Sequence, residues 1–321
     1  MLPICLILVS CLFSLVPSPA AAEVVIRVGH FPNVTHVQGL VAQHLSRTGK
    51  GWYEERLGKD VKIEWYVYNA GPSAMEAILA DSIDLTYVGP SPALNAYVKS
   101  NGEEIRIVAG AARGGAALLV QPDSELKQPN DFRGKTIATP QLGNTQDVAC
   151  RAWLADGGLK ITQTGGDVLI VPTPNPDQLS LFLQKKLDGV WTVEPWVSRL
   201  EREAGAKVLV EQSKESITVL VSSVKFLKTR PELARRFAQA HRELTAWILS
   251  HPEEAKRMVQ QELAIETQAR VSAELIAHAW TRIALTTEAI PQEYQQFVAN
   301  AQRAGFIRTA PDLSRLIERL N

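Results

Sequence analysis

Short apolar runs alternate with segments of helical periodicity over the first third of the chain. The runs that indicate strands cover 24–29, 61–67, 83–89 and 105–109, and the first and third of them end at a glycine. Between them, apolar residues recur every three or four positions in 37–45, 71–79 and 91–98. Strands that alternate with helices predict parallel βαβ units in an open α/β sheet.

The same alternation starts again after residue 113. Strand-like runs at 117–120, 135–138, 167–171, 189–193 and 207–210 are separated by predicted helices at 144–156 and 176–186. A further strand at 216–222 precedes predicted helices at 231–249, 252–262, 272–285 and 291–304. This order predicts an α/β fold of two lobes with a helical C-terminal segment. We expect residues 23–112 and 216–321 to form lobe 1 and residues 113–215 to form an inserted lobe 2, with a hinge where the chain crosses.

Composition and the first residues indicate an exported protein. The 321-residue chain has a formal net charge of +0, which gives no reason to expect nucleic acid as a partner. Residues 1–22 carry no charge and end in small residues, which is typical of a cleaved signal peptide and predicts a periplasmic location. Lipidation at Cys11 is the less favoured alternative. Cys150 alone remains after such a leader, so no internal disulfide is possible, and its apolar neighbours favour a buried side chain.

The chemistry is concentrated where predicted helices begin after strands. A helix N-terminus has unpaired N–H groups and a partial positive charge, and in α/β sheets such ends collect at the carboxyl edge where ligands bind. Four segments have this character: 69–73, 89–92, 143–146 and 175–178. Ser91 and Asn175 each precede a proline, so both also fit ordinary helix caps, and Asn175 with Gln178 fits a capping box. The segment Gly143, Asn144, Thr145 and Gln146 has no proline and is the strongest candidate for ligand contact.

Two further segments are candidates for the site. The loop after the first strand contains Asn33, Thr35 and His36. Too few histidines and cysteines lie near this loop to predict a metal site. Glu194 and Trp196 follow another predicted strand. A carboxylate is awkward beside an anion, so Glu194 would suit a ligand with a nitrogen donor, or it would pair with an arginine such as Arg113. Arg113 could equally bind an oxyanion itself.

The chain carries none of the common catalytic motifs. It has no G-x-S-x-G elbow, no P-loop, no H-E-x-x-H and no G-x-G-x-x-G after the first strand. We therefore expect a binding protein that uses no cofactor and no metal, and not an enzyme.

Several of these segments, in the same order, resemble the type II periplasmic binding proteins of the aliphatic sulfonate, taurine and nitrate group. The matching stretches are 69–77, 83–89, 131–138, 184–191 and 194–196. The resemblance implies two lobes that close over a small ligand, in the Venus-flytrap manner, and delivery to an inner-membrane ABC permease with its ATPase. It places ligand contacts at Asn33 or Thr35, Gly71, Ser91, Gly114 and the 143–146 loop, and it implies a monomer.

The ligand stays open at the level of the sequence. A small oxyanion such as an aliphatic sulfonate, taurine or nitrate fits the helix starts. A nitrogen heterocycle such as a pyrimidine precursor would instead use Trp191, Glu194 and Trp196. A third possibility is a sensor subunit that presents the same ligand to a membrane receptor.

Overall fold

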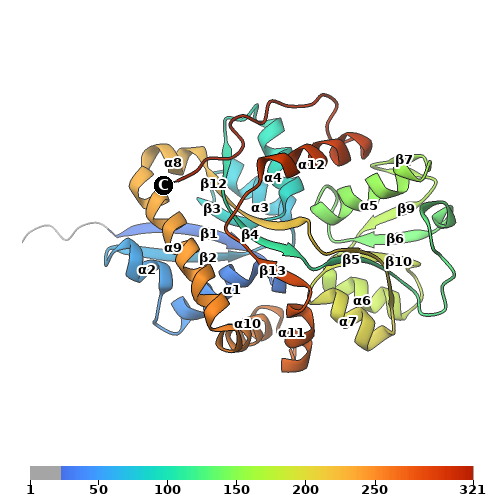
Figure 1. Ribbon diagram of the computed structural model, residues 1–321, viewed down its shortest axis with the longest axis horizontal. Helices are drawn as coiled ribbons and strands as arrows, with labels where there is room; N and C mark the ends of the chain where they lie inside the picture. The colour runs from blue at the N-terminus through green and yellow to red at the C-terminus, as the bar shows by residue number, and fades with distance from the viewer. Residues whose placement is uncertain (1–22, 321) are drawn as a thin grey trace, which may run out of the picture.

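Two mixed β-sheets lie side by side and form the two halves of the molecule (Figure 1). The computed structural model describes residues 23–320, so the predicted leader lies outside the described residues. The first sheet has the strand order β13-β4-β12-β3-β1-β2 and the second has the order β11-β5-β10-β6-β9. The strands of the first sheet are β1 (Val24–His30), β2 (Val61–Val67), β3 (Leu85–Val88), β4 (Ile105–Gly114), β12 (Ser216–Ser223) and β13 (Ile283–Leu285). Those of the second are β5 (Ala116–Val120), β6 (Thr136–Thr139), β9 (Leu169–Pro172), β10 (Gly189–Val193) and β11 (Lys207–Gln212).

The βαβ units produce the parallel part of each sheet. β1 pairs in parallel with β2 and β3, and β6 pairs in parallel with β9 and β10. In the first sheet β12 and β13 run antiparallel to the neighbours with which they pair, and in the second sheet β5 runs antiparallel to both of its neighbours, β10 and β11. The chain passes from the first sheet to the second between β4 and β5 and returns between β11 and β12. The grouping of the strands supports the predicted boundaries of the two lobes, which remain a prediction.

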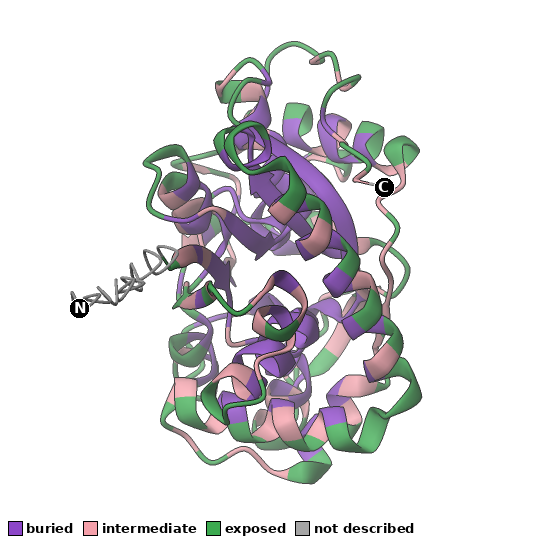
Figure 2. Ribbon diagram, turned by 90° about the vertical axis from the view of Figure 1, so that its left-hand side faces the viewer, coloured by how far each residue is buried: buried purple, intermediate pink, exposed green. Residues whose placement is uncertain are grey.

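Helices cover both faces of each sheet, and the buried residues concentrate between the layers (Figure 2). The first sheet is packed between one set of helices on one face, α1 (Val37–Arg47), α2 (Trp52–Leu57), α9 (Pro231–Ser250), α10 (Pro252–Thr267) and α11 (Ala273–Trp280), and another on the opposite face, α3 (Gly71–Leu79), α4 (Pro90–Lys99) and α12 (Pro291–Arg303). The second sheet lies between α5 (Thr145–Asp156) and the pair α6 (Asn175–Leu183) and α7 (Trp196–Ala204). Short elements complete the described chain: η1 (Val34–His36), η2 (Pro129–Phe132), α8 (Val224–Thr229) and a hairpin of β7 (Ile161–Thr162) and β8 (Gly165–Gly166). None of the helices within residues 23–320 combines the length and apolar character needed to cross a membrane.

The C-terminal segment differs from its predicted form at one point. The periodicity predicts one helix over 272–285, but α11 ends at Trp280 and Ile283–Leu285 forms strand β13, paired antiparallel with β4. Pairing with a distant strand supplies the backbone hydrogen bonds that the helix would otherwise have supplied. Cys150 is buried and free, as predicted, and burial raises the pKa of its thiol, which keeps it protonated.

A buried histidine in α9 makes the stability of lobe 1 depend on pH. His241 Nε2 lies 2.8 Å from the Gly110 carbonyl oxygen, and Nδ1 lies 3.0 Å from the Tyr87 hydroxyl. The Gly110 carbonyl can only accept, so Nε2 carries a proton, and in the neutral ring Nδ1 accepts from the Tyr87 hydroxyl. Burial lowers the pKa of His241 to about 4 from its ordinary 6.5.

We expect the wild type to lose roughly 2–4 kcal/mol of unfolding free energy through His241 as the pH falls from 6.5 to about 4. In that window the unfolded chain binds a proton at this residue and the folded chain does not, so stability decreases with falling pH. Urea unfolding at pH 7, 6, 5 and 4 measures the slope. His241→Gln keeps one donor and one acceptor without titrating, and it should show a shallower slope. Equal slopes would assign the pH dependence to other groups.

Candidate functional site

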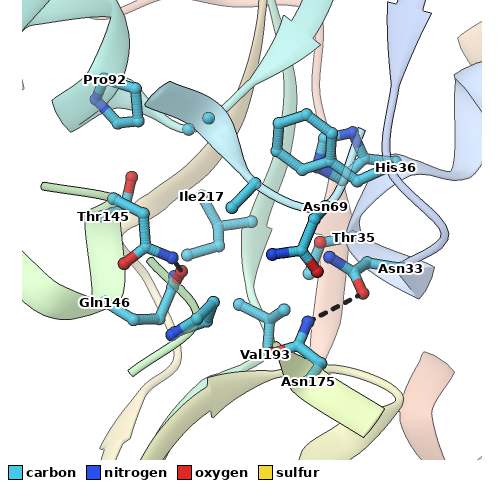
Figure 3. A pocket seen from close by; sticks show the side chains of 16 residues that line it. Asn33, Thr35, His36, Asn69, Pro92, Thr145, Gln146, Asn175, Val193 and Ile217 are labelled. Atoms are coloured by element: carbon cyan, nitrogen blue, oxygen red, sulfur yellow. Dashed lines mark hydrogen bonds between the residues drawn. The ribbon is translucent and has the colours of Figure 1, made fainter. Parts of the chain in front are cut away.

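Loops from both sheets enclose a small cavity at the carboxyl ends of their strands (Figure 3). Its volume is about 30 Å³, far below the roughly 300–1,000 Å³ of pockets for drug-sized ligands. In its present form the cavity therefore accommodates only a very small molecule or one end of a larger one. The lining residues are Phe31, Asn33, Thr35, His36, Asn69, Ala70, Gly71, Gly89, Pro92, Pro140, Asn144, Thr145, Gln146, Asn175, Val193 and Ile217.

Four helices begin at this cavity. Gly71, Thr145 and Asn175 are the first residues of α3, α5 and α6, and Gly89 is the N-cap of α4. At α3, α4 and α6 no N-cap side chain accepts a hydrogen bond from the helix, although prolines in the first turns remove at least one donor from each and the Ser91 N–H of α4 points to Thr145 Oγ1. Among the described residues that line the cavity there is no Lys, Arg, Asp or Glu. Its electrostatic potential is therefore set by the partial positive charges of helix ends and by neutral polar groups.

Two glycines make this convergence possible. A β-carbon at Gly71 would lie 2.3 Å from Pro92 Cγ, and one at Gly89 would lie 2.2 Å from Thr145 Oγ1. Both distances are too short for any other residue without rearrangement. The starts of α3 and α4 can thus approach each other and the start of α5 because both positions lack a side chain.

His36 contributes a neutral ring to the wall. Its ring centroid lies 4.3 Å from that of Phe31, with the two planes tilted by 35°, and its Nδ1 atom is buried with no hydrogen-bond partner among the described residues. Burial lowers the pKa of His36 well below its ordinary value, and the nearby His30 lowers it further. The ring is therefore uncharged at neutral pH and offers one donor and one acceptor.

A network of amides joins the loop after β1 to the second sheet. Asn33 Oδ1 accepts from Trp196 Nε1 at 3.2 Å and from Asn175 Nδ2 at 3.4 Å, and Thr192 Oγ1 donates to Asn175 Oδ1 at 3.1 Å. Because the oxygen of Asn33 is occupied, the part of Asn33 that can serve a ligand is its NH₂ group. Such donors and the helix ends suit a ligand that accepts hydrogen bonds.

Hydrogen bonds from Asn144 and the buried Asp147 hold the Asn144–Gln146 turn in place. Asn144 Oδ1 caps α5 by accepting from the Asp147 N–H at 2.8 Å. The buried Asp147 carboxylate accepts from Thr139 Oγ1 and from the Gly143 N–H, both at 2.9 Å, and pairs with Arg151. Gly143 has φ +78°, in the left-handed region that favours glycine. The turn is thereby preorganised before any ligand binds.

The predicted site residues divide into two groups. Those that line the cavity are Asn33, Thr35, His36, Gly71, Asn144, Thr145 and Gln146. Those that lie outside it are Ser91, Arg113, Gly114, Gly143, Glu194 and Trp196.

Each residue outside the cavity has another partner. The Ser91 N–H points to Thr145 Oγ1 at 3.4 Å, and the Gly143 N–H is bound to Asp147. The Gly114 N–H donates to the Glu215 carbonyl at 3.0 Å, and Arg113 forms an ion pair with Glu293. Trp196 stands behind Asn33 and positions it. These residues support the wall of the site and do not form its surface.

Glu194 is the clearest correction. Its buried carboxylate accepts from the Ser198 hydroxyl at 2.9 Å and the Ser198 N–H at 3.1 Å, and its ion-pair partner is Arg282, not Arg113. Burial raises the pKa of Glu194, while Ser198 and Arg282 oppose that change. Trp191 is also unavailable to a ligand, because it lies in the core and its Nε1 donates to Gln212. The constellation expected for a nitrogen heterocycle does not form.

The capping interpretations of Ser91 and Asn175 were wrong as well. α4 begins one residue earlier, with Gly89 as its N-cap, and the N-cap of α6 is Pro174. Gln178 donates to the Thr173 carbonyl and not into a capping box. Asn175 instead lines the cavity, as do Phe31 and Asn69, and the sequence analysis did not single out these three as ligand contacts. An uncapped helix start after a strand was the signal for Asn175; Val193 and Ile217 carried no such signal.

With this geometry established, comparison with known proteins places the chain. The model of the NMT1-like family matches residues 20–264. The chain belongs to the NMT1-like family. This match and the relatives below confirm the resemblance to periplasmic binding proteins seen in the sequence.

Two curated relatives show how similar this NMT1-like protein is to known binding proteins. A Bacillus subtilis protein, named as an aliphatic sulfonates-binding protein, is 26% identical over 212 residues, which span 64% of this chain and 62% of that protein. A Brucella abortus protein, named only as a binding protein, is 22% identical over 271 residues, 79% of this chain and 78% of that protein.

Solved structures show the same fold. The alkanesulfonate-binding protein SsuA from Xanthomonas axonopodis pv. citri, bound to MOPS, superposes with a TM-score of 0.71 at 19% identity, covering 88% of this chain and 93% of that chain. The periplasmic nitrate-binding protein NrtA from Synechocystis PCC 6803 gives 0.73 at 15% identity, covering 91% and 85%. At these identities the likeness concerns the fold, and it confirms the predicted fold class.

Among residues 23–320, no three His, Cys, Asp or Glu side chains are grouped so that they could hold a metal ion. The polar groups of the cavity are amides, hydroxyls, one imidazole and backbone N–H groups. Their common chemistry is hydrogen-bond donation to an oxygen-rich ligand.

Proposed function

We propose that this NMT1-like protein is the exported solute-binding component of an ABC-type importer and that it captures a small oxyanion between its two lobes. One observation carries the ligand class: four helix N-termini converge on a cavity whose lining contains no charged side chain. Helix ends and neutral donors stabilise an anion without a compensating cation, whereas a cationic ligand would find no carboxylate here. Aliphatic sulfonates are the first candidates, and taurine and nitrate follow.

The arrangement of the two sheets supports capture by closure. We propose that residues 23–112 and 216–321 act as one lobe and residues 113–215 as the other, hinged where β4 leads into β5 and β11 into β12. Contacts already bridge the two halves at the cavity, through Asn33 with Asn175 and Ser73 with Gln141. Opening at the hinge would admit a ligand, and closure would surround it.

The names of the relatives support the transport role. A sulfonates-binding and a nitrate-binding protein share the family or the fold. Delivery to an inner-membrane permease with its ATPase, a periplasmic location after removal of residues 1–22, and a monomeric state belong to the same proposal. None of the relatives named here is an enzyme, which supports binding without chemical turnover.

The ligand class is tested by thermal-shift and calorimetric titration against alkanesulfonates, taurine, nitrate, sulfate and aminopyrimidines. A ligand at about 100 times its Kd should add ~2.7 kcal/mol of stability. Stabilisation by an oxyanion supports the proposal. Stabilisation by aminopyrimidines alone would overturn it in favour of a heterocycle binder.

Thr145 provides the site-specific test. We expect Thr145→Ala to weaken oxyanion binding roughly ten- to a hundredfold, because a hydrogen bond to a charged group contributes about 1.5–3 kcal/mol. Thr145→Ser retains the hydroxyl and should bind within a few-fold of the wild type. Thr162→Ala removes an exposed hydroxyl of the same half and serves as the control. Unchanged affinity in Thr145→Ala would remove Thr145 from the site.

A further inference from the structure

A second hollow lies directly behind Thr145, and the proposed function as stated does not use it. Its volume is about 290 Å³, and α5, α12 and the start of α4 line it together with the segments that cross between the sheets. The helices contribute Ser91, Thr145, Ala149, Gln296, Phe297 and Asn300 to its lining. We call this hollow the α12 chamber.

The linings of the chamber and the cavity share one described residue, Thr145. Thr145 lines both hollows, and Thr145 Oγ1 reaches the Ser91 N–H at 3.4 Å. That distance exceeds the usual 2.7–3.2 Å of an N–H···O bond, so the contact is weak. Gly89 has no side chain on the other side of Thr145, where a β-carbon would lie 2.2 Å from Oγ1. For the two hollows to join, the Thr145 side chain must move, by rotation about χ1 or by a small opening of the lobes.

The sizes of the two hollows are complementary. The cavity, at about 30 Å³, has room for the head group of an oxyanion but not for an attached chain. The chamber, at about 290 Å³, is close to the lower limit for a pocket that binds an organic molecule. A ligand with an organic part needs space beyond the cavity, and the chamber supplies it next to the helix ends.

The chemistry of the chamber differs from that of the cavity. Phe297 is 9% exposed and Ala149 8%, and they present an aromatic ring and a methyl group. The charged residues around the chamber are balanced, since Arg113 pairs with Glu293 and the segment before β12 contributes Lys214 and Glu215. The formal charges of these four described residues sum to zero, so they give a second ionic group no net attraction. The chamber therefore favours an uncharged hydrocarbon part.

We propose that the α12 chamber receives the uncharged alkyl or aryl tail of a ligand whose oxyanion head lies in the cavity. The ligands of this protein are then organic oxyanions, and bare inorganic ions such as nitrate bind more weakly. This inference rests on the proposed function and makes it narrower. Taurine, with its charged amine, is disfavoured for the same reason.

A chain-length series tests the inference. Titration calorimetry measures the Kd of methane-, ethane-, propane-, butane- and hexanesulfonate, with nitrate and taurine for comparison. Each methylene that enters an apolar space improves affinity about fourfold. We expect that gain per carbon in the wild type until the chamber is filled, and weaker binding of nitrate and taurine.

Two variants fill the chamber from opposite walls. Ala149→Leu acts from α5, one turn beyond Thr145, and Asn300→Phe acts from α12. Both should abolish the gain with chain length while methanesulfonate binds within about twofold of wild type. Gln302→Phe adds the same bulk on the exposed side of α12 and should retain the full series. Two variants on different helices guard against a folding defect in either one.

The readouts separate the two proposals. If methanesulfonate binds but filling the chamber leaves the chain-length gain intact, the tail lies elsewhere and this inference is overturned, while the proposed function stands. A flat series in the wild type overturns it in the same way. If no oxyanion binds at all, both proposals are overturned. Loss of the gain in both filling variants, with methanesulfonate retained, supports the chamber.

Discussion

Replacing Asp147 with alanine is expected to lower the free energy of unfolding by about 3–5 kcal/mol, the range for breaking a buried ion pair. The Asp147 carboxylate is 0% exposed, and Arg151, one turn later on α5, is 1% exposed with Nε 2.9 Å from it. Without the carboxylate, the Arg151 cation would remain in the interior with no counter-charge. Its charge is too costly to bury unpaired.

Oxyanion affinity should fall in the same variant. The Asp147 carboxylate also accepts from Thr139 Oγ1 and the Gly143 N–H, so its loss frees the turn that presents Thr145 and Gln146 to the cavity. A turn that must be ordered on binding costs affinity that a preorganised turn does not. Ligand titration of the folded variant measures this effect separately from stability.

Urea unfolding at pH 7 measures the stability change in Asp147→Ala. The double variant Asp147→Ala/Arg151→Met also removes the cation and should be more stable than Asp147→Ala alone. Arg133→Met provides the control, because Arg133 is 60% exposed in its pair with Asp167 and such surface pairs contribute only about 0–1 kcal/mol. An Asp147→Ala variant no less stable than this control would contradict the assignment.

Arg282→Gln is expected to cost about 3 kcal/mol of unfolding free energy. Arg282, between α11 and β13, contacts three carboxylates that follow β10 or lie beyond it: Glu194 at 3.2 Å, Glu201 at 2.8 Å and Glu211 at 3.1 Å. Glu194 is 0% exposed and keeps only its bonds to Ser198 when the arginine is lost. The Glu194 carbonyl also accepts from the Val34 N–H, so the same segment anchors the loop of Asn33 and Thr35.

The pH dependence identifies the mechanism. Burial already raises the pKa of Glu194, and removing Arg282 removes an interaction that lowers it. A carboxyl whose folded pKa lies above its unfolded value destabilises the protein as the pH rises through the folded pKa. The stability difference between Arg282→Gln and wild type should therefore shrink as the pH falls from 7 toward 5.

Urea unfolding at each pH measures this difference. Arg202→Gln, which removes a nearby exposed arginine, should change stability by no more than about 0.5 kcal/mol at any pH. A pH-independent loss in Arg282→Gln would show that packing, and not the Glu194 charge, accounts for the cost.

The elements of the fold were largely predictable because their signals are local. Apolar residues with a period near two or 3.6 marked most strands and helices, and the strand at 216–222 corresponds to β12, Ser216–Ser223. The short strand β13 was missed, since its hydrogen bonds come from β4, far away in the sequence. Local periodicity cannot show which distant backbone will supply a partner.

The candidate site was predictable where it is formed by the N-termini of helices. Gly71 and the Asn144–Gln146 turn were found because a glycine or a polar turn after a strand marks a helix start. The charged and aromatic candidates lie outside the cavity lining: Arg113 pairs with Glu293, 180 residues away, and Glu194 with Arg282, 88 residues away. A charged side chain in a sequence has many possible counter-charges.

The sequence by itself determined the class of the fold, the positions of most helix starts and the neutral, polar character of the ligand loops. Only the tertiary structure decided that Asn33 and Asn175 meet, that Glu194 faces Arg282, and that a chamber lies behind Thr145. The physical reason is the distance along the chain between the residues that interact. Periodicity, caps and turns depend on neighbouring residues, whereas charge pairing and the shape of a cavity depend on side chains that folding brings together from distant parts of the chain.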